Sequence, residues 1–150
     1  MNEIKHFMAA SAHAIGHDQT LPFAHERMQQ WGVRQLPVLD GGVLVGVISE
    51  RDIALVEAIA PSEATTTTVE EAMSSEPYAV APDADIAQVT QHMAEHRYSC
   101  AIVMDNHKVV GVFTTIDALT LLSGLLRGDA SLPATQVVAA LHPAGKRPRK

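Results

Sequence analysis

Two short stretches of the sequence place a hydroxyl residue three positions before an aspartate, directly after an apolar run. They are VGVISERDIA (45–54), with Ser49 and Asp52, and VVGVFTTIDAL (109–119), with Thr114 and Asp117. An aspartate in the first turn of a helix stabilises the helix dipole by about 0.3–1 kcal/mol. The same carboxylate offers acceptor oxygens that a ligand can use. From the two stretches alone, both interpretations of the aspartates stay open.

The two stretches belong to an internal repeat with an offset of 65 residues. This offset, kept without a gap, aligns Met28 with Met93 and the VGV of 45–47 with the VGV of 110–112. Further identical pairs are Met8/Met73, Ala14/Ala79, Asp18/Asp83, Val38/Val103 and Asp40/Asp105. The apolar positions between them also stay in register. Because an internal repeat determines the architecture, we analyse the chain as two copies of one unit.

Both copies predict the same order of elements. Thr20 and Asp85 are good N-cap residues, and apolar residues spaced i, i+3 and i+7 follow each of them, which predicts an amphipathic helix. Short apolar strands joined by the tight turns DGG and DNH are expected next, at 35–39 and 43–49 and at 100–104 and 108–114. A second helix is expected from about Glu50 to Ile59 and from about Thr115 to Leu126. A short extended piece precedes each first helix.

The unit is therefore β-α-β-β-α, and the predicted fold class is α/β, in the α+β sense of mixed helices and strands. A unit of about 55 residues buries little apolar surface by itself. We therefore expect the two repeats to pack about a pseudo-twofold axis and to leave two equivalent clefts. The expected boundaries are repeat 1 at 1–60, a linker at 61–68, repeat 2 at 69–126, and a C-terminal extension with a disordered basic tail at 127–150.

Composition restricts the class of protein. Apolar residues make up 47% of the chain, which suits a packed core, and the single cysteine excludes an internal disulfide. No apolar run approaches the length of a membrane helix and no signal peptide is evident, so we expect a cytoplasmic protein without a membrane partner. The net charge is −6, although KRPRK (146–150) holds four of the eleven basic residues. Such an acidic body argues against a nucleic-acid surface.

The pattern apolar–Gly–Val–apolar–[Ser/Thr]–x–x–Asp after a hairpin resembles the cystathionine-β-synthase (CBS) domain. Two copies in tandem, over residues 4 to about 126, resemble a stand-alone Bateman module. The resemblance implies a sensor without catalytic activity that binds an adenosine-containing ligand. AMP, ADP and ATP are the expected class, and S-adenosylmethionine and NAD are further members. The nucleotide would be a regulatory ligand and no other cofactor is expected. The resemblance also implies a homodimer and an unidentified protein effector.

The resemblance also implies two sites, in which the Asp accepts hydrogen bonds from both ribose hydroxyls. A carboxylate with two acceptor oxygens suits such a diol. The first implied site comprises Ser49, Arg51, Asp52, Ser74, Ala79, Tyr98, Ser99 and Cys100. The second comprises Thr114, Asp117, Ala9, Ala14, Val33, Arg34 and Gln35. Arg51 is suited to contact a phosphate, whereas the second copy has Ile116 there. We therefore expect the Asp52 site to hold a phosphate better.

Four alternatives remain. The first is a ligand-free interaction or dimerisation module with degenerate clefts; LTLLSGLL (119–126) is apolar nearly all round, which indicates burial against a partner. The second is an enzyme, although the chain has no G-x-S-x-G, H-E-x-x-H or P-loop motif. A metal site is the third, since His92 and His96 share a helix face, but no further ligand completes it and surface histidines are expected. The fourth is nucleic-acid binding by the tail.

Overall fold

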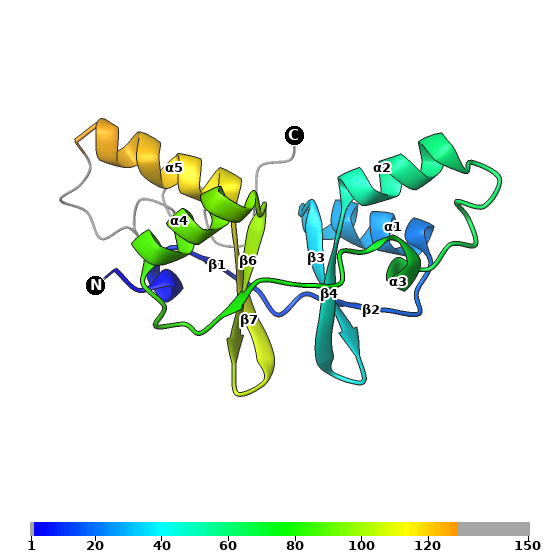
Figure 1. The fold of residues 1–150 in the computed structure, drawn as a ribbon, viewed down its shortest axis with the longest axis horizontal. Helices are drawn as coiled ribbons and strands as arrows, with labels where there is room; N and C mark the ends of the chain where they lie inside the picture. The colour runs from blue at the N-terminus through cyan, green and yellow to red at the C-terminus, as the bar shows by residue number, and fades with distance from the viewer. Residues whose placement is uncertain (1, 129–150) are drawn as a thin grey trace. The chain divides into compact units, whose positions relative to one another are not determined.

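The computed structural model describes residues 2–128, and these form two sheets covered by helices (Figure 1). The elements follow in the order η1 (Ile4–His6), β1 (Ala9–Ala10), β2 (Ile15–Gly16), α1 (Leu21–Trp31), β3 (Gln35–Asp40), β4 (Val43–Ser49), α2 (Glu50–Ile59), α3 (Val69–Ala72), β5 (Ala79–Val80), α4 (Ile86–His96), β6 (Cys100–Asp105), β7 (Lys108–Thr114) and α5 (Thr115–Leu126). This order confirms the predicted α+β class. The C-terminal extension from residue 129, with its basic tail, lies outside the described residues.

The chain folds into two compact units whose limits differ from those of the sequence repeats. Residues 13–77 form one, here called the Asp52 unit, and residues 2–12 with 78–128 form the other, the Asp117 unit. The first segment of each repeat therefore packs with the other copy. Val69 is buried in the core of the Asp52 unit, and Ile4 is buried in the core of the Asp117 unit.

Each unit is built on an antiparallel hairpin with a parallel strand beside it. The sheet of the Asp52 unit has the order β2-β3-β4, and that of the Asp117 unit has the order β1-β7-β6-β5. In both sheets the short strand before the first helix runs parallel to the first hairpin strand. Figure 1 shows α2 leaving β4, and α5 leaving β7, at the hairpin end away from the turn. This end carries both Ser/Thr–x–x–Asp motifs.

The first helix of each copy buries the predicted apolar stripe. Leu21, Ala24 and Met28 of α1, and the equivalent residues of α4, lie in the two cores. The predicted N-caps are also confirmed, since Thr20 accepts a hydrogen bond from the backbone N–H of Phe23 and Asp85 accepts one from that of Gln88. The DGG turn has Gly41 and Gly42 at φ 55° and 83°, a backbone region that few other residues adopt easily. Apolar stripes, N-caps and turn residues with positive φ occur in both copies, so the two copies form the same helices and hairpins.

A close backbone approach on β4 explains why the apolar run contains a glycine. The N–H and C=O of Val47 both pair with Ser74, at 3.0 Å each, so that residues 73–74 run along the edge of the hairpin. A Cβ at Gly46 would lie 2.6 Å from the backbone oxygen of Ser74. In β7, Gly111 faces Met8 and Ala9 in the same way. The incoming segment therefore requires the glycine of each VGV.

We expect Gly46→Ala to lower the free energy of unfolding by about 1–3 kcal/mol, because the added methyl group must push Met73 and the backbone of Ser74 away from β4. Urea unfolding measures the loss. The matched control is Val43→Ala on the same strand, where the side chain is 64% exposed and a smaller effect is expected. Equal losses in the two variants would contradict the proposed close contact.

Candidate functional site

Both Ser/Thr–x–x–Asp motifs form reciprocal capping boxes at the start of a helix. In α2, the Ser49 hydroxyl accepts from the N–H of Asp52 at 3.1 Å, and Oδ2 of Asp52 accepts from the N–H of Ser49 at 2.9 Å. Thr114 and Asp117 make the same pair of bonds at the start of α5, at 3.2 and 2.9 Å. The interpretation of the aspartates as first-turn residues that stabilise a helix is thus confirmed. Each box satisfies two backbone N–H groups that the helix itself cannot bond.

The capping boxes occupy only one oxygen of each carboxylate. All hydrogen bonds that described residues make to the side chains of Asp52 and Asp117 end on Oδ2, and none of these residues donates to Oδ1. The cap holds the carboxylate in one orientation, so its second oxygen is positioned without further ordering. A carboxylate oxygen can accept more than one hydrogen bond. The cap and a ligand therefore do not compete for the same acceptor.

The two motifs differ in burial and in local charge. Asp117 is 3% exposed and receives an additional bond from the Thr114 hydroxyl at 3.0 Å, whereas Asp52 is half-buried. Arg51, next to Asp52, is exposed and makes no ion pair with any residue of the described chain. Ile116 takes that position in the Asp117 unit and is also exposed. The guanidinium therefore gives the Asp52 motif an attraction for anions that its counterpart lacks.

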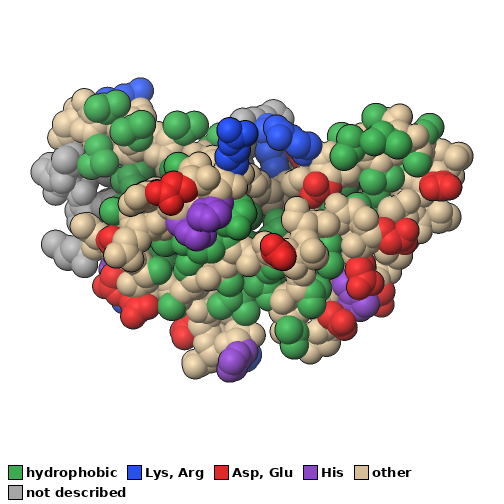
Figure 2. Space-filling model, in the orientation of Figure 1, with side chains coloured by type: hydrophobic (Ala, Val, Ile, Leu, Met, Phe, Trp, Pro, Cys, Tyr) green, Lys and Arg blue, Asp and Glu red, His purple; other side chains and the backbone are tan. Residues whose placement is uncertain are grey.

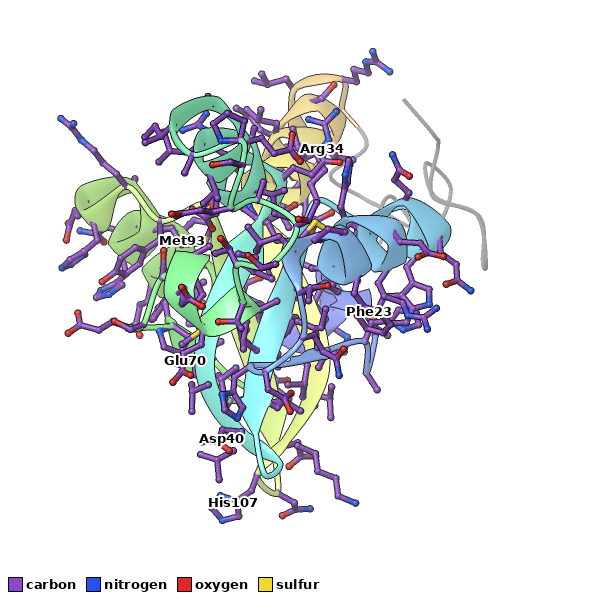
Figure 3. All side chains as sticks on the ribbon, turned by 90° about the vertical axis from the view of Figure 1, so that its right-hand side faces the viewer. Phe23, Arg34, Asp40, Glu70, Met93 and His107 are labelled. Atoms are coloured by element: carbon purple, nitrogen blue, oxygen red, sulfur yellow. The ribbon has the colours of Figure 1, made fainter. Side chains whose placement is uncertain are left out.

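In the Asp52 unit, the start of β3 lies beside the motif. Gln35 is paired with Ser49 in the sheet, and the backbone oxygen of Arg34 accepts from the N–H of Glu50 at 2.9 Å. The side chains of Arg34 and Glu50 form an ion pair of 3.9 Å in which both groups are largely exposed. Ser74 reaches the same end of the hairpin through its pairing with Val47. Figure 3 shows Arg34 toward this end and Asp40 toward the other.

In the Asp117 unit, Ser99 and Cys100 occupy the corresponding places beside the motif. Cys100 is paired with Thr114, and the N–H of Thr115 donates to the backbone oxygen of Ser99 at 3.0 Å. Burial raises the pKa of the Cys100 thiol to about 11, against a smaller lowering by its hydrogen bond with Ser99. Because the thiolate is the nucleophile, such a thiol is inert near neutral pH. Ala9 of β1 pairs with Val112, two residues before Thr114.

The ring of Tyr98 belongs to an aromatic cluster on α4. Its ring centroid lies 5.3 Å from that of His96 and 5.6 Å from that of Tyr78, and the rings of His92 and His96 stack at 4.0 Å. His96 is exposed, as expected for a surface histidine, but His92 is half-buried within the cluster. Among the described residues, no three His, Cys, Asp or Glu side chains gather closely enough to hold a metal ion.

Each predicted site draws residues from both units. The structure brings Ser49, Arg51, Asp52 and Ser74 of the first site into the Asp52 unit; it places the rest, Ala79, Tyr98, Ser99 and Cys100, in the Asp117 unit. For the second site, Thr114, Asp117 and Ala9 lie in the Asp117 unit, whereas Ala14, Val33, Arg34 and Gln35 lie in the Asp52 unit. The grouping of these residues into two binding sites stays a prediction.

Sequence reasoning missed two features of these motifs. The reciprocal bond from Asp back to the cap residue was not expected, although a hydroxyl three residues before an acid is its usual signature. Glu50 was also missed; its carboxylate faces Arg34, which is sixteen positions earlier in the printed sequence. No spacing rule relates these two residues, because they meet only when the hairpin forms.

We expect Thr114→Ala to lower the free energy of unfolding by about 0.5–2 kcal/mol, because the N–H of Asp117 loses its acceptor. Ser49→Ala is expected to cost less, since the Ser49 hydroxyl makes one bond fewer to its aspartate. Denaturant unfolding compares the two with Thr115→Ala, whose exposed side chain is outside the box. A loss in Thr115→Ala as large as that in Thr114→Ala would contradict the role of the capping box.

Comparison with known proteins agrees with the repeat. The family model of the CBS domain matches residues 4–58 and 69–124. The CBS domain-containing protein YhcV of Bacillus subtilis is 30% identical over 131 residues, which cover 87% of this chain and 93% of YhcV. Hypoxic response protein 1 of Mycobacterium tuberculosis is 28% identical over 118 residues, 78% of this chain and 82% of that protein.

Solved structures show the same fold. AcuB from Vibrio cholerae superposes with a TM-score of 0.73 at 27% identity, covering 88% of this chain and 98% of AcuB. The CBS domain pair of protein MJ0100, solved in complex with 5′-methylthioadenosine and S-adenosyl-L-methionine, superposes with a TM-score of 0.72 at 25% identity. It covers 82% of this chain and 97% of the pair. The two family matches span most of the chain and coincide with its two β-α-β-β-α copies, so this protein belongs to the CBS domain family, with two CBS domains in tandem.

Proposed function

We propose that this chain is a regulatory module that binds an adenosine-containing ligand at its Ser/Thr–x–x–Asp motifs and transmits the occupancy to a partner. One observation carries the proposal: the capping box fixes each aspartate through Oδ2 and leaves Oδ1 without a donor among the described residues. An acceptor held in place at a helix start suits a ribose hydroxyl. The MJ0100 pair, which holds two adenosine compounds, supports this ligand class.

The Asp52 motif is the better candidate for a ligand that carries a phosphate. Arg51 offers a guanidinium without a described ion-pair partner, and the N-terminal end of α2 carries the positive end of the helix dipole. Glu50 opposes a highly charged ligand, because its carboxylate lies in the same first turn. We therefore propose a mono- or diphosphate such as AMP or ADP in preference to ATP. The Asp117 motif suits a ligand with a neutral or cationic tail.

A ligand-free module is the second candidate function, because the capping boxes alone account for both aspartates. The ligand-binding proposal assigns a role to Oδ1 of each aspartate and the ligand-free proposal does not, so a binding experiment separates them. We propose no catalytic role for the thiol beside the Asp117 motif. Cys100 is the one described thiol there, and its raised pKa keeps it protonated.

A thermal-shift panel of AMP, ADP, ATP, S-adenosylmethionine and NAD tests ligand binding. Stabilisation should follow RT ln(1 + [L]/Kd), about 2.7 kcal/mol at a hundredfold excess over Kd. We expect Asp52→Ala to remove the shift produced by AMP, and Asp117→Ala to leave it in place. Asp85→Ala is the matched control, because it also removes an N-cap aspartate but lies outside both motifs. No shift with any of the five ligands would overturn the proposal.

We also propose that the chain forms a homodimer through the exposed apolar faces of α2 and α5. Figure 2 shows hydrophobic side chains over α5 and, separately, over α2. The exposed residues are Leu55 and Ile59 of α2 and Ile116, Leu119, Leu122, Leu125 and Leu126 of α5. An apolar patch of this kind is typical of a surface that a partner covers.

No described helix is both long and apolar enough to cross a membrane.

We expect Leu122→Glu to convert the dimer to a monomer, because a buried carboxylate without a partner opposes association. Sedimentation analysis at several concentrations measures the mass. The control is Thr120→Glu on the same helix, where the native side chain is polar and half-buried. A wild-type chain that sediments as a monomer at all concentrations would contradict the homodimer.

A further inference from the structure

A histidine in the Asp52 unit lies between two carboxylates that come from different elements. Nε2 of His17 is 3.3 Å from Oδ1 of Asp40, at the end of β3, and Nδ1 is 3.2 Å from Oε2 of Glu70 in α3. The His17 side chain is 28% exposed. Figure 3 shows Glu70 and Asp40 following one another along the side of the β3–β4 hairpin. This arrangement, here called the His17 clamp, connects α3 to the hairpin.

The protonation state of the imidazole decides whether the His17 clamp holds. A neutral imidazole has one N–H donor and one acceptor nitrogen, so it can donate to only one of the two carboxylates. Only the imidazolium donates to both. The hydrogen bond with Glu70 is the largest effect and raises the pKa of His17; desolvation, the second largest, lowers it, and the negative charges of Asp40, Glu70 and Asp18 raise it. Among the residues that the structure describes, these three carboxylates are the charged groups that act on His17.

The element that the clamp holds is too short to persist alone. α3 comprises Val69–Ala72, a single turn, and isolated turns of helix are unstable in water. Two backbone hydrogen bonds hold α3 in place. The N–H of Val69 donates to the carbonyl oxygen of Gln19 at 2.8 Å, and the N–H of Glu70 donates to that of His17 at 3.0 Å. The chain then continues directly to Ser74 on the edge of β4. Ser74 is held on β4 by its own two backbone bonds with Val47, and α3 anchors the segment that leads to it.

The other copy contains the same backbone arrangement without the clamp. At the equivalent positions, the N–H of Ile4 donates to Ala84 at 2.8 Å, and the N–H of Lys5 donates to Pro82 at 3.0 Å. Pro82 thus replaces His17, and Lys5 replaces Glu70. The backbone frame forms with no imidazole and no second carboxylate. The His17 clamp is an addition to the Asp52 unit that its fold does not require.

We propose that His17 is a pH-sensitive clamp that docks α3 on the β3–β4 hairpin, and that it thereby makes ligand affinity at the Ser49–Asp52 motif depend on pH. The second part rests on the proposed function, which places a ligand at the Ser49–Asp52 motif. The coupling is argued from the position of Ser74, which lies at the same end of β4 as Ser49. A histidine whose pKa is raised by folding adds stability that is fully present below its unfolded value of 6.5. That stability is lost as pH rises through the folded pKa. Ligand affinity in wild type should therefore fall as pH rises.

An NMR titration of the histidine rings tests the clamp without any ligand. We expect the midpoint of His17 to lie above 6.5, and Glu70→Gln to move this midpoint toward 6.5. Asp105→Asn, at the position equivalent to Asp40 in the other copy, should leave the midpoint unchanged. Unfolding experiments should show His17→Ala to be destabilised more at pH 5.5 than at pH 8.5. A His17 midpoint that Glu70→Gln does not move would overturn the clamp.

Calorimetric titration with AMP at pH 6 and pH 8.5 tests the coupling. The AMP phosphate itself titrates in this range, so the informative quantity is the difference between wild type and His17→Ala. We expect the affinity of wild type to fall about two- to fivefold more than that of His17→Ala. Equal pH dependence in the two proteins would overturn the coupling alone. Absence of AMP binding at both pH values would overturn the proposed AMP site and the coupling with it, and the NMR result would still decide the clamp.

Discussion

The backbone pairing of an incoming segment with the edge of each hairpin is the constraint on which the rest of both units depends. Ser74 pairs with Val47, and Ala9 pairs with Val112, in the same register. Each pairing covers a strand edge that would otherwise expose unpaired N–H and C=O groups. It also carries an apolar residue of the other repeat into the core, which in the Asp52 unit is Val69. The chain therefore alternates between the units, and neither unit corresponds to one continuous sequence repeat.

The capping box explains how one aspartate serves both the fold and a candidate site. The Asp52 side chain already accepts a hydrogen bond from the N–H of Ser49, so it loses little further freedom when a ligand binds to it, which favours affinity. In the Asp117 unit the carboxylate is more deeply buried and more fully bonded. That arrangement favours stabilisation of the start of α5 over binding of a ligand by the carboxylate. The two copies thus contain the same motif but differ in the burial of the aspartate and in the hydrogen bonds that it accepts.

Local periodicity was sufficient to predict most of the secondary structure. The stripe of Leu21, Ala24 and Met28, the N-cap at Thr20 and both hairpins follow from residues within one helix turn or one tight turn of each other. The exchange of segments was not predicted, because the apolar character of Val69 does not say which core it enters. The His17–Glu70 contact joins residues 53 positions apart, and no pattern in the sequence relates them. Both aspartates lie in the first turn of a helix, as predicted, but the sequence did not indicate which of their oxygens the cap occupies.

The two copies share one backbone arrangement. A residue that occurs in only one of them is therefore not required to form that arrangement. Where Pro82 and His17 accept the same backbone bond, the imidazole cannot be required for that bond. Where Ile116 and Arg51 occupy the same place in a first turn, the guanidinium cannot be required for the cap. Both additions occur in the Asp52 unit. They support the proposal that the Asp52 motif is the one that takes an anionic ligand, because neither is needed to form the frame that the two copies share.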